Sequence, residues 1–516
     1  MATFRRSMYI NISKDSVRIP DAISTFKELR PPIWSSSSKK NNDGHMTQVL
    51  KSILYNIEIG EWKEPTAIQM QAVPSLLEKR DVMASAPTGS GKSGAFITPA
   101  LILSAPSASV YYERKEEDTK NNNNKAKKGK KNHHASRQGE IRCLILAPSR
   151  ELAAQLHREV ERLGHGRPGG FSSLLLAKSN INQLNQVGGQ RGLDILITTP
   201  LRLIDAIEGK NVKLDSLRLI VLDEADRLLD ATDLNDHKSG SAHSKTFVSQ
   251  LDTILAATPK SAIRALFSAT ITPAVQELSD SILREPINIT IQSANSRVGG
   301  ANSDITQELL FCGKEEGKLL AIRQMVAKGE LRPPALVFCQ SKERAQALFA
   351  ELLYDNLHVD VLHAGRSASA RETAVKNFRI GQTWILICTD LVARGVDFSS
   401  VQLVINYDIP TSGVTYVHRI GRTGRAGRKG KAITFFTEPD LEHLRGIANV
   451  MKQSGCEVSD WMLNIRQKTG KDKKKTIHRK SIDTTSGYDK MKKNRKMMSI
   501  QSSKKRKKEA AVPDKN

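Results

Sequence analysis

Short apolar runs recur along this chain, and each ends in a small or polar residue. They lie at Cys143 to Ala147, Asp194 to Thr198, Leu219 to Asp223, Arg264 to Ser268, Ala335 to Cys339, Val359 to His363, Trp384 to Cys388 and Gln402 to Asn406. Apolar runs without alternation are typical of parallel strands buried on both faces. Helical patterns separate the runs, so we predict an α/β fold with two tandem parallel-sheet domains. Ligands of such sheets bind at the carboxyl ends of the strands, where the polar residues stand.

The net charge of +25 is concentrated in segments that contain little to bury. Residues Asn464 to Asn516 contain 19 Lys or Arg and only 5 Asp or Glu, and Glu113 to Arg137 contain 9 and 4. Such compositions are typical of disorder, so we expect basic appendages on mildly basic domains. The longest uncharged stretch, Ser93 to Tyr112, contains prolines and follows a glycine-rich loop. We interpret it as a buried helix and its exit, and expect no membrane span.

These shifts in composition give a domain plan. We expect an N-terminal arm over 1–22, a first domain over 23–290, a linker over 291–306, a second domain over 307–450 and a basic C-terminal extension over 451–516. Polar loop insertions are predicted in the first domain near 35–43, 113–138 and 232–244.

A glycine-rich phosphate-binding loop is predicted between a short apolar run and a helical segment. It reads Ala86-Pro87-Thr88-Gly89-Ser90-Gly91-Lys92-Ser93. Backbone N–H groups and a helix N-terminus favour phosphate oxygens, Lys92 would reach the outer phosphates, and Ser93 would offer its hydroxyl to Mg²⁺. The alternative is a Gly/Ser turn that happens to contain lysine.

Two carboxylates follow a buried apolar run at Asp223 and Glu224. Carboxylates at such a place are costly to bury unless a cation is near, and Mg²⁺ with ATP would supply one. Asp223 would hold the metal through water, and Glu224 would orient and deprotonate the attacking water. The alternative is a solvated start of a helix.

Seven segments in one order resemble the motifs of the DEAD-box RNA helicases. They are Pro65 to Gln69, Ala86 to Ser93, Pro148 to Ala153, Thr199 to Arg202, Asp223 to Asp226, Ser268 to Thr270 and His418 to Arg425. The resemblance covers roughly Thr25 to Met462. It implies two RecA-like domains that bind ATP with Mg²⁺, and RNA, across the cleft between them.

The resemblance also assigns residues to roles around ATP. Gln69 is implied to contact the adenine edge, with Trp62 on the ring, and Asp397 to contact the ribose. Arg422 and Arg425 are implied to stabilise the γ-phosphate from the second domain, a task suited to planar guanidinium groups. Asp226, Ser268, Thr270 and His418 are implied to link hydrolysis to RNA through hydrogen bonds.

The RNA contacts that the resemblance implies suit phosphates and the 2′-hydroxyl rather than base edges. They are Arg150, Gly189, Thr199 and Arg202 in the first domain, and Arg371 and Thr389 in the second. The core is therefore expected to bind RNA without sequence specificity and to bend one strand, which separates short duplexes locally.

Several departures from the family pattern point to a subgroup. Leu201 replaces the usual Gly after Thr199-Pro200, while Ser149 and Ser93 replace threonines. Together with the flanking residues, the departure at Leu201 resembles the Rok subgroup, helicases of small-ribosomal-subunit assembly. The flanking segments are Thr199 to Ile204, Trp384 to Asp390, Gly395 to Phe398, Val404 to Pro410 and Ser454 to Val458.

We therefore expect an RNA-dependent ATPase that unwinds or remodels RNA or ribonucleoprotein in ribosomal RNA maturation. The alternative is an ATP-gated RNA clamp without substantial unwinding. Pre-ribosomal RNA, protein cofactors, a monomeric state and a nuclear, nucleolar location are further expectations. Basic clusters such as Lys504 to Lys508 would serve as a nuclear address or an RNA tether, or be merely solvated charge.

Overall fold

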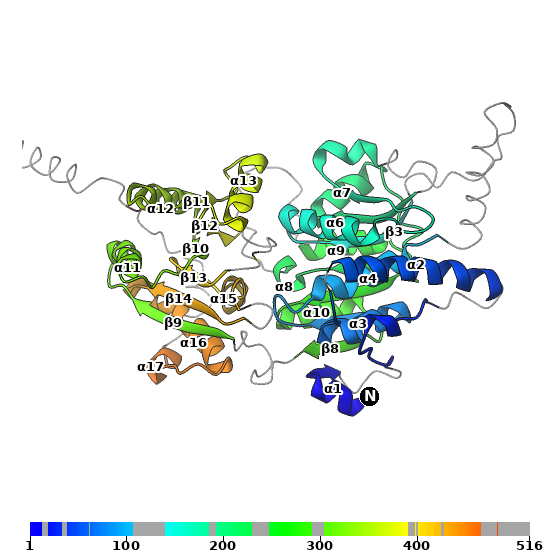
Figure 1. Cartoon of the computed structure of the whole chain (residues 1–516), viewed down its shortest axis with the longest axis horizontal. Coiled ribbons are helices and arrows are strands. Elements are labelled where there is room, and N and C mark those ends of the chain that lie inside the picture. The colour runs from blue at the N-terminus through cyan, green and yellow to red at the C-terminus, as the bar shows by residue number, and fades with distance from the viewer. Residues whose placement is uncertain are drawn as a thin grey trace, which may run out of the picture.

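A computed structural model of the chain shows two α/β domains in tandem (Figure 1). The structure describes residues 1–12, 19–32, 39–60, 62–106, 140–184, 192–229, 247–291, 304–390, 398, 401–424, 428–465 and 482. The expected fold class is confirmed. The insertions predicted near 113–138 and 232–244 lie outside the described residues. The insertion predicted over 35–43 is only partly a loop, because helix α2 (Lys39–Ile59) begins inside it.

The first domain is built on a sheet in the order β1-β8-β2-β7-β6-β3-β5-β4. Its strands are β1 (Ile10–Ile12), β2 (Val82–Ser85), β3 (Ile141–Leu146), β4 (Ser173–Leu175), β5 (Leu193–Thr198), β6 (Leu219–Leu222), β7 (Ile263–Ser268) and β8 (Ile287–Ile291). Neighbouring strands are parallel except for β1, which pairs antiparallel with β8. Every residue of β2, β3, β5 and β6 is buried, as expected for strands covered on both faces.

Helices cover both faces of this sheet (Figure 1). They are α1 (Ala2–Ser7), α2, α3 (Ala67–Leu77), α4 (Lys92–Leu103), α6 (Arg150–Gly164), α7 (Pro200–Glu208), α8 (Ala225–Leu228), α9 (Phe247–Ala256) and α10 (Pro273–Ile282), with short 3₁₀ helices η1 (Phe26–Glu28) and η2 (Lys178–Gln183). One apolar core packs under α2, α3, α4 and α6, and a second packs under α7, α9 and α10.

The second domain has a parallel sheet in the order β11-β12-β10-β13-β14-β9. Its strands are β9 (Ile305–Phe311), β10 (Ala335–Cys339), β11 (Val359–Leu362), β12 (Ile385–Thr389), β13 (Leu403–Asn406) and β14 (Gly430–Phe436). Its helices are α11 (Glu315–Ala327), α12 (Lys342–Tyr354), α13 (Ala368–Arg379), α15 (Gly413–Ile420), η5 (Glu438–Asp440), α16 (Leu441–Gln453) and α17 (Asp460–Leu463). Helix α17 packs on α16, so folded structure continues past residue 450.

All eight predicted apolar runs form strands. The helix predicted after the phosphate loop is α4, and it is buried from Gly94 to Leu103. None of the helices in the described ranges combines the length and the hydropathy needed to cross a bilayer.

Candidate active site

Strand order brings three predicted motifs to one edge of the first sheet. Strands β2, β7 and β6 are neighbours, and their carboxyl ends lead into the phosphate loop, the Ser268 segment and Asp223. The loop is tied to β7 directly, because the Ala86 N–H donates to the Ser268 carbonyl oxygen over 3.2 Å. Motifs 45 to 182 residues apart in the sequence, from Asp223–Ser268 to Ala86–Ser268, are thus adjacent in space.

The phosphate loop turns back toward the start of α4 through two glycines in the left-handed region. Gly89 has φ +81° and Gly91, the N-cap of α4, has φ +91°. This backbone geometry favours glycine. Lys92 Nζ donates to the carbonyl oxygens of Ala86 and Pro87, the latter over 2.9 Å. The Ser90 hydroxyl is buried and has no hydrogen-bond partner within the described part of the chain.

The carboxylates at the end of β6 differ in their electrostatics. Burial first, and then Glu224, raise the pKa of Asp223, while Lys92 opposes the rise. Burial would raise the pKa of Glu224 too, but Arg227 and Arg422, together with His418 whenever its ring is protonated, outweigh burial and lower it. Glu224 is consequently ionised, while Asp223 is a carboxyl group that a cation would stabilise.

Arg227 is the direct partner of Glu224. Its Nη1 lies 2.7 Å from Glu224 Oε2, and both side chains are largely buried. Glu224 itself has φ +51° as the N-cap of α8, so its side chain leaves the end of β6 at a sharp turn. Arg227 was not predicted from the sequence, although its i+3 spacing from Glu224 on a helix is a signal for such a pair.

The adenine side of the site is a cleft of about 660 Å³ lined by Trp62, Gln69 and the glycines of the loop. The Gln69 amide is already engaged within the protein. Its Oε1 accepts from the Thr66 N–H, and its Nε2 donates to the Gly91 carbonyl, both over 3.0 Å. A Cβ at Gly94 would lie 2.5 Å from Gln69 Nε2 and 2.7 Å from the Trp62 ring. Gly94 therefore allows Trp62 and Gln69 to lie close against α4.

Asp226 is the meeting point of the two domains. Its Oδ2 accepts from the Thr270 N–H at 3.0 Å and the Thr270 hydroxyl at 2.7 Å, and lies 3.2 Å from His418 Nε2 in the second domain. Burial would raise the pKa of Asp226, but His418 and Thr270 lower it well below its usual range. Ser268 reaches Asp226 only through Thr270, whose carbonyl oxygen accepts from the Ser268 hydroxyl at 2.8 Å.

Two further contacts join the domains. The Thr88 hydroxyl of the phosphate loop donates to the Gly421 carbonyl oxygen over 3.2 Å, and a Cβ at Gly421 would collide with that hydroxyl. Arg371 of α13 forms an ion pair with Glu151 of α6. Arg422 is buried and lies close enough to influence Glu224. Arg425 and Asp397 lie outside the described residues. No pattern in the sequence pointed to Thr88, Glu151 or Gly421 as contacts between domains.

The residues predicted to contact RNA occupy another stretch of the same edge. Strands β3 and β5 are neighbours, and Arg150 and Thr199 stand at the starts of the helices that follow them. Arg150 is exposed, and Arg202 pairs with Asp205 over 2.7 Å. Thr389 ends β12 and is 8% exposed. Leu201 is 47% exposed beside Arg202. Gly189 lies outside the described residues.

The residues of this edge fit a magnesium-bound nucleoside triphosphate. Three features support this fit: the unpaired Ser90 hydroxyl, the Lys92 ammonium directed at carbonyl groups of its own loop, and the raised pKa of Asp223. Ser93 and Asp223 are the residues that would hold the metal. Bound Mg²⁺ would neutralise phosphate charge and orient the phosphates.

Family models match both domains. The model described as DEAD/DEAH box helicase matches residues 66–278, and the model described as Helicase conserved C-terminal domain matches residues 317–427.

Curated relatives match most of the chain. It is 42% identical over 473 residues to the ATP-dependent RNA helicase ROK1 of Eremothecium gossypii, covering 89% of this chain and 74% of that protein. It is 41% identical to ROK1 of Saccharomyces cerevisiae, covering 86% and 72%.

Among solved structures, the chain is similar to S. cerevisiae Dbp5 bound to RNA and ADP BeF3, with TM-score 0.61 and 26% identity over 80% of this chain and 94% of that one. It is also similar to Mss116p bound to ssRNA and AMP-PNP, with TM-score 0.60 and 25% identity over 84% and 83%.

Proposed function

This chain belongs to the DEAD-box family of ATP-dependent RNA helicases, and we propose that it couples ATP hydrolysis with Mg²⁺ to RNA binding and local duplex unwinding in small-subunit ribosome assembly. As a member of that family it is an RNA-dependent ATPase. We propose further which RNA it acts on, which residues act in hydrolysis and in which process it works. The observation that carries it is Asp226, on which hydrogen bonds from both domains converge beside Glu224.

Each reacting group has a separate task. Glu224 accepts the proton of the attacking water, and its lowered pKa keeps it ionised for that purpose. Lys92 neutralises charge on the outer phosphates. Arg422 stabilises charge that develops on the transferred phosphoryl group, with Arg425 as its predicted partner. Because Arg422 belongs to the second domain, hydrolysis requires the closed arrangement of the two domains.

We propose that RNA binds along the edge formed by α6, α7 and α13. Arg150, Thr199, Arg202 and Arg371 bind backbone phosphates and 2′-hydroxyls across both domains. Dbp5 and Mss116p each have RNA bound in those structures, which supports an RNA path here. An RNA that bridges the domains would favour closure, and hydrolysis would release it.

The similarity to relatives named ROK1 supports the biological setting that the Rok-like residues imply. We place this chain in the nucleus, in the nucleolus, acting on pre-ribosomal RNA as a monomer with protein cofactors of the ribonucleoprotein. Lysine clusters after residue 470 would serve as the nuclear address or as an RNA tether.

The experiment is a comparison of wild type, Lys92→Ala and Glu224→Gln. Wild type should hydrolyse ATP faster with RNA than with DNA and separate a short RNA duplex. Lys92→Ala should weaken nucleotide binding, and Glu224→Gln should bind ATP and RNA but lose turnover by about 10²-fold or more. A Glu224→Gln protein that turns over ATP normally would show that the water-activating role is wrongly assigned.

The same assays separate the helicase from the second candidate, an ATP-gated RNA clamp. The three contacts between the domains favour a stable closed state, which is what an RNA clamp requires. A clamp would show RNA-stimulated hydrolysis and slow RNA release, but no strand separation.

A further inference from the structure

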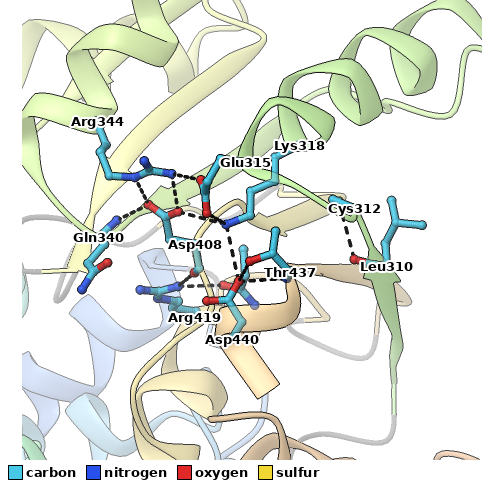
Figure 2. A network of polar contacts seen from close by, with 11 residues as sticks. Leu310, Cys312, Glu315, Lys318, Gln340, Arg344, Asp408, Arg419, Thr437 and Asp440 are labelled. Carbon is cyan, nitrogen blue, oxygen red and sulfur yellow. Dashed lines mark hydrogen bonds and ion pairs between the residues drawn. The ribbon is translucent and has the colours of Figure 1, made fainter. Parts of the chain in front are cut away.

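A buried cluster of charged residues lies in the second domain, away from the residues that face ATP (Figure 2). Lys318, Asp408 and Asp440 have 0% side-chain exposure, and Arg344 has 6%. We call these four residues together with Glu315 the buried ion cluster. Figure 2 shows them converging from α11, α12, the end of β13 and η5.

The cluster is closely bonded. Arg344 donates to both carboxylate oxygens of Asp408, at 2.8 and 2.7 Å, and to Glu315 at 2.8 Å. Lys318 Nζ lies 2.9 Å from Glu315, 3.5 Å from Asp408 and 3.6 Å from Asp440. Burial would lower the pKa of Arg344, but Asp408 and Glu315 outweigh burial and raise it. Arg344 therefore stays charged, and its directional bonds define where Asp408 lies.

Asp408 connects this cluster to α15, the helix that directly precedes Arg422. While its carboxylate holds α12 and α11, its backbone carbonyl oxygen accepts from Arg419 Nη1 over 2.6 Å. Arg419 also donates two hydrogen bonds of 2.6 Å to the carboxylate oxygens of Asp390. Arg419 lies in α15 beside His418, which contacts Asp226, and three residues before Arg422. A continuous chain of contacts thus runs from α12 to the reaction centre.

Apolar residues would fill this space without the desolvation that buried ions cost. Five charged residues with directional bonds instead select one placement of the segment after β13. A displacement of about 1 Å at a reacting group can reduce turnover about 100-fold. The cluster is therefore suited to holding α15 accurately.

We infer that Arg344, acting through Asp408 and Arg419, is a positioning residue for ATP hydrolysis: it sets α15 so that His418 reaches Asp226 and Arg422 faces Glu224. The inference rests on the proposed function. It extends that function by naming a residue far from the nucleotide that affects the rate of hydrolysis. Arg344 touches neither ATP nor RNA in this scheme. It affects the rate only through where α15 lies.

The test compares Arg344→Lys with a matched control, Arg323→Lys. Lysine keeps the charge of Arg344 but loses the fork that holds Asp408. Arg323 also joins α11 to α12, through bonds of 2.7 and 3.1 Å to Asp355 and 3.1 Å to Glu351, but contacts no member of the chain to α15. Both variants should melt near the wild-type temperature. Arg344→Lys should lower the kcat of RNA-stimulated hydrolysis about 10-fold, with KM for ATP within about 2-fold, while Arg323→Lys keeps kcat within about 2-fold.

A double-mutant cycle with His418→Gln distinguishes positioning from general weakening. If Arg344 acts through α15, Arg344→Lys should cost much less in the His418→Gln background than in wild type. Full additivity, or equal losses for Arg344→Lys and Arg323→Lys, would overturn the inference. If Arg344→Lys fails to fold, Glu315→Gln, which removes one acceptor of Arg344 at the partly exposed side of the cluster, takes its place. Loss of RNA stimulation in wild type itself would instead contradict the proposed function.

Discussion

At the scale of single residues, His418 is the residue of the second domain that contacts Asp226 of the first. It is buried in the closed arrangement, where burial and Arg227 lower its pKa below the ordinary 6.5, and Asp226 and Glu224 partly oppose them. Its neutral form is therefore the one that the closed cleft accommodates. In an open arrangement the ring would return to water and to its ordinary pKa.

This difference predicts a pH dependence of closure. The closed state holds fewer protons at His418 than the open state, so closure is favoured above pH 6.5 and weakens as pH falls below it. Fluorescence energy transfer between labels on α6 and α13, measured with AMP-PNP and RNA from pH 5.5 to 8, should show less closure at the acid end. His418→Gln should flatten the profile, and an unchanged slope in that variant would mean that another group titrates.

At the scale of elements, the N-terminal arm is part of the first sheet. Ile10–Ile12 pair with β8, and Ile10 is 3% exposed. Arg5 donates to Gln71 of α3 at 2.8 Å and to the Pro20 carbonyl at 2.7 Å. Because α3 also carries Gln69, the arm supports the helix that borders the adenine side of the cleft.

Deleting residues 1–12 should therefore affect both stability and nucleotide binding. Loss of Ile10 burial and the Arg5 bonds should cost about 2–4 kcal/mol, seen as a fall in Tm. KM for ATP should rise while RNA affinity at saturating ATP changes little. Arg6→Ala, at an exposed position of α1, is the control. A truncated protein with wild-type Tm and KM would show that the arm is dispensable.

The strands that were predicted from the sequence are ones that helices cover on both faces. The eight continuous apolar runs could only be covered strands, and the strand order then explained why Ala86, Asp223 and Ser268 meet. Five of the described strands were not predicted: β1, β4, β8, β9 and β14. Strand β9 lies at a sheet edge and its exposure varies, and β1 has only three residues, too few to show a period. The internal bonds of Gln69 and the cluster around Asp408 depend on tertiary packing, which residue spacing alone does not reveal.

At the scale of the whole molecule, the ion pair between Glu151 and Arg371 predicts that substitutions can change closure of the two domains and RNA binding independently. Arg371→Glu places two carboxylates opposite each other and should reduce RNA-stimulated hydrolysis about 10-fold. The exchange Glu151→Arg with Arg371→Glu should restore closure in the energy-transfer assay but leave RNA affinity low. Restoration of both would show that Arg371 serves only the ion pair.

The basic tail should change RNA affinity without changing the reaction. Residues 464–516 supply 14 of the 25 net positive charges. Deleting residues 472–516 should weaken RNA binding and flatten its dependence on salt, because fewer counterions are released, while hydrolysis at saturating RNA persists. An identical salt titration for both proteins would rule out a tethering role.

The contact between Thr88 and Gly421 has one more consequence. The two domains approach there so closely that a Cβ at position 421 would collide with the Thr88 hydroxyl. Partial approach would leave that bond unmade, and the Asp226 to His418 bond with it. The enzyme should accordingly have two states, open and closed. Intermediate separations of the domains should contribute nothing to turnover, so the observed rate should be proportional to the fraction of molecules in the closed state.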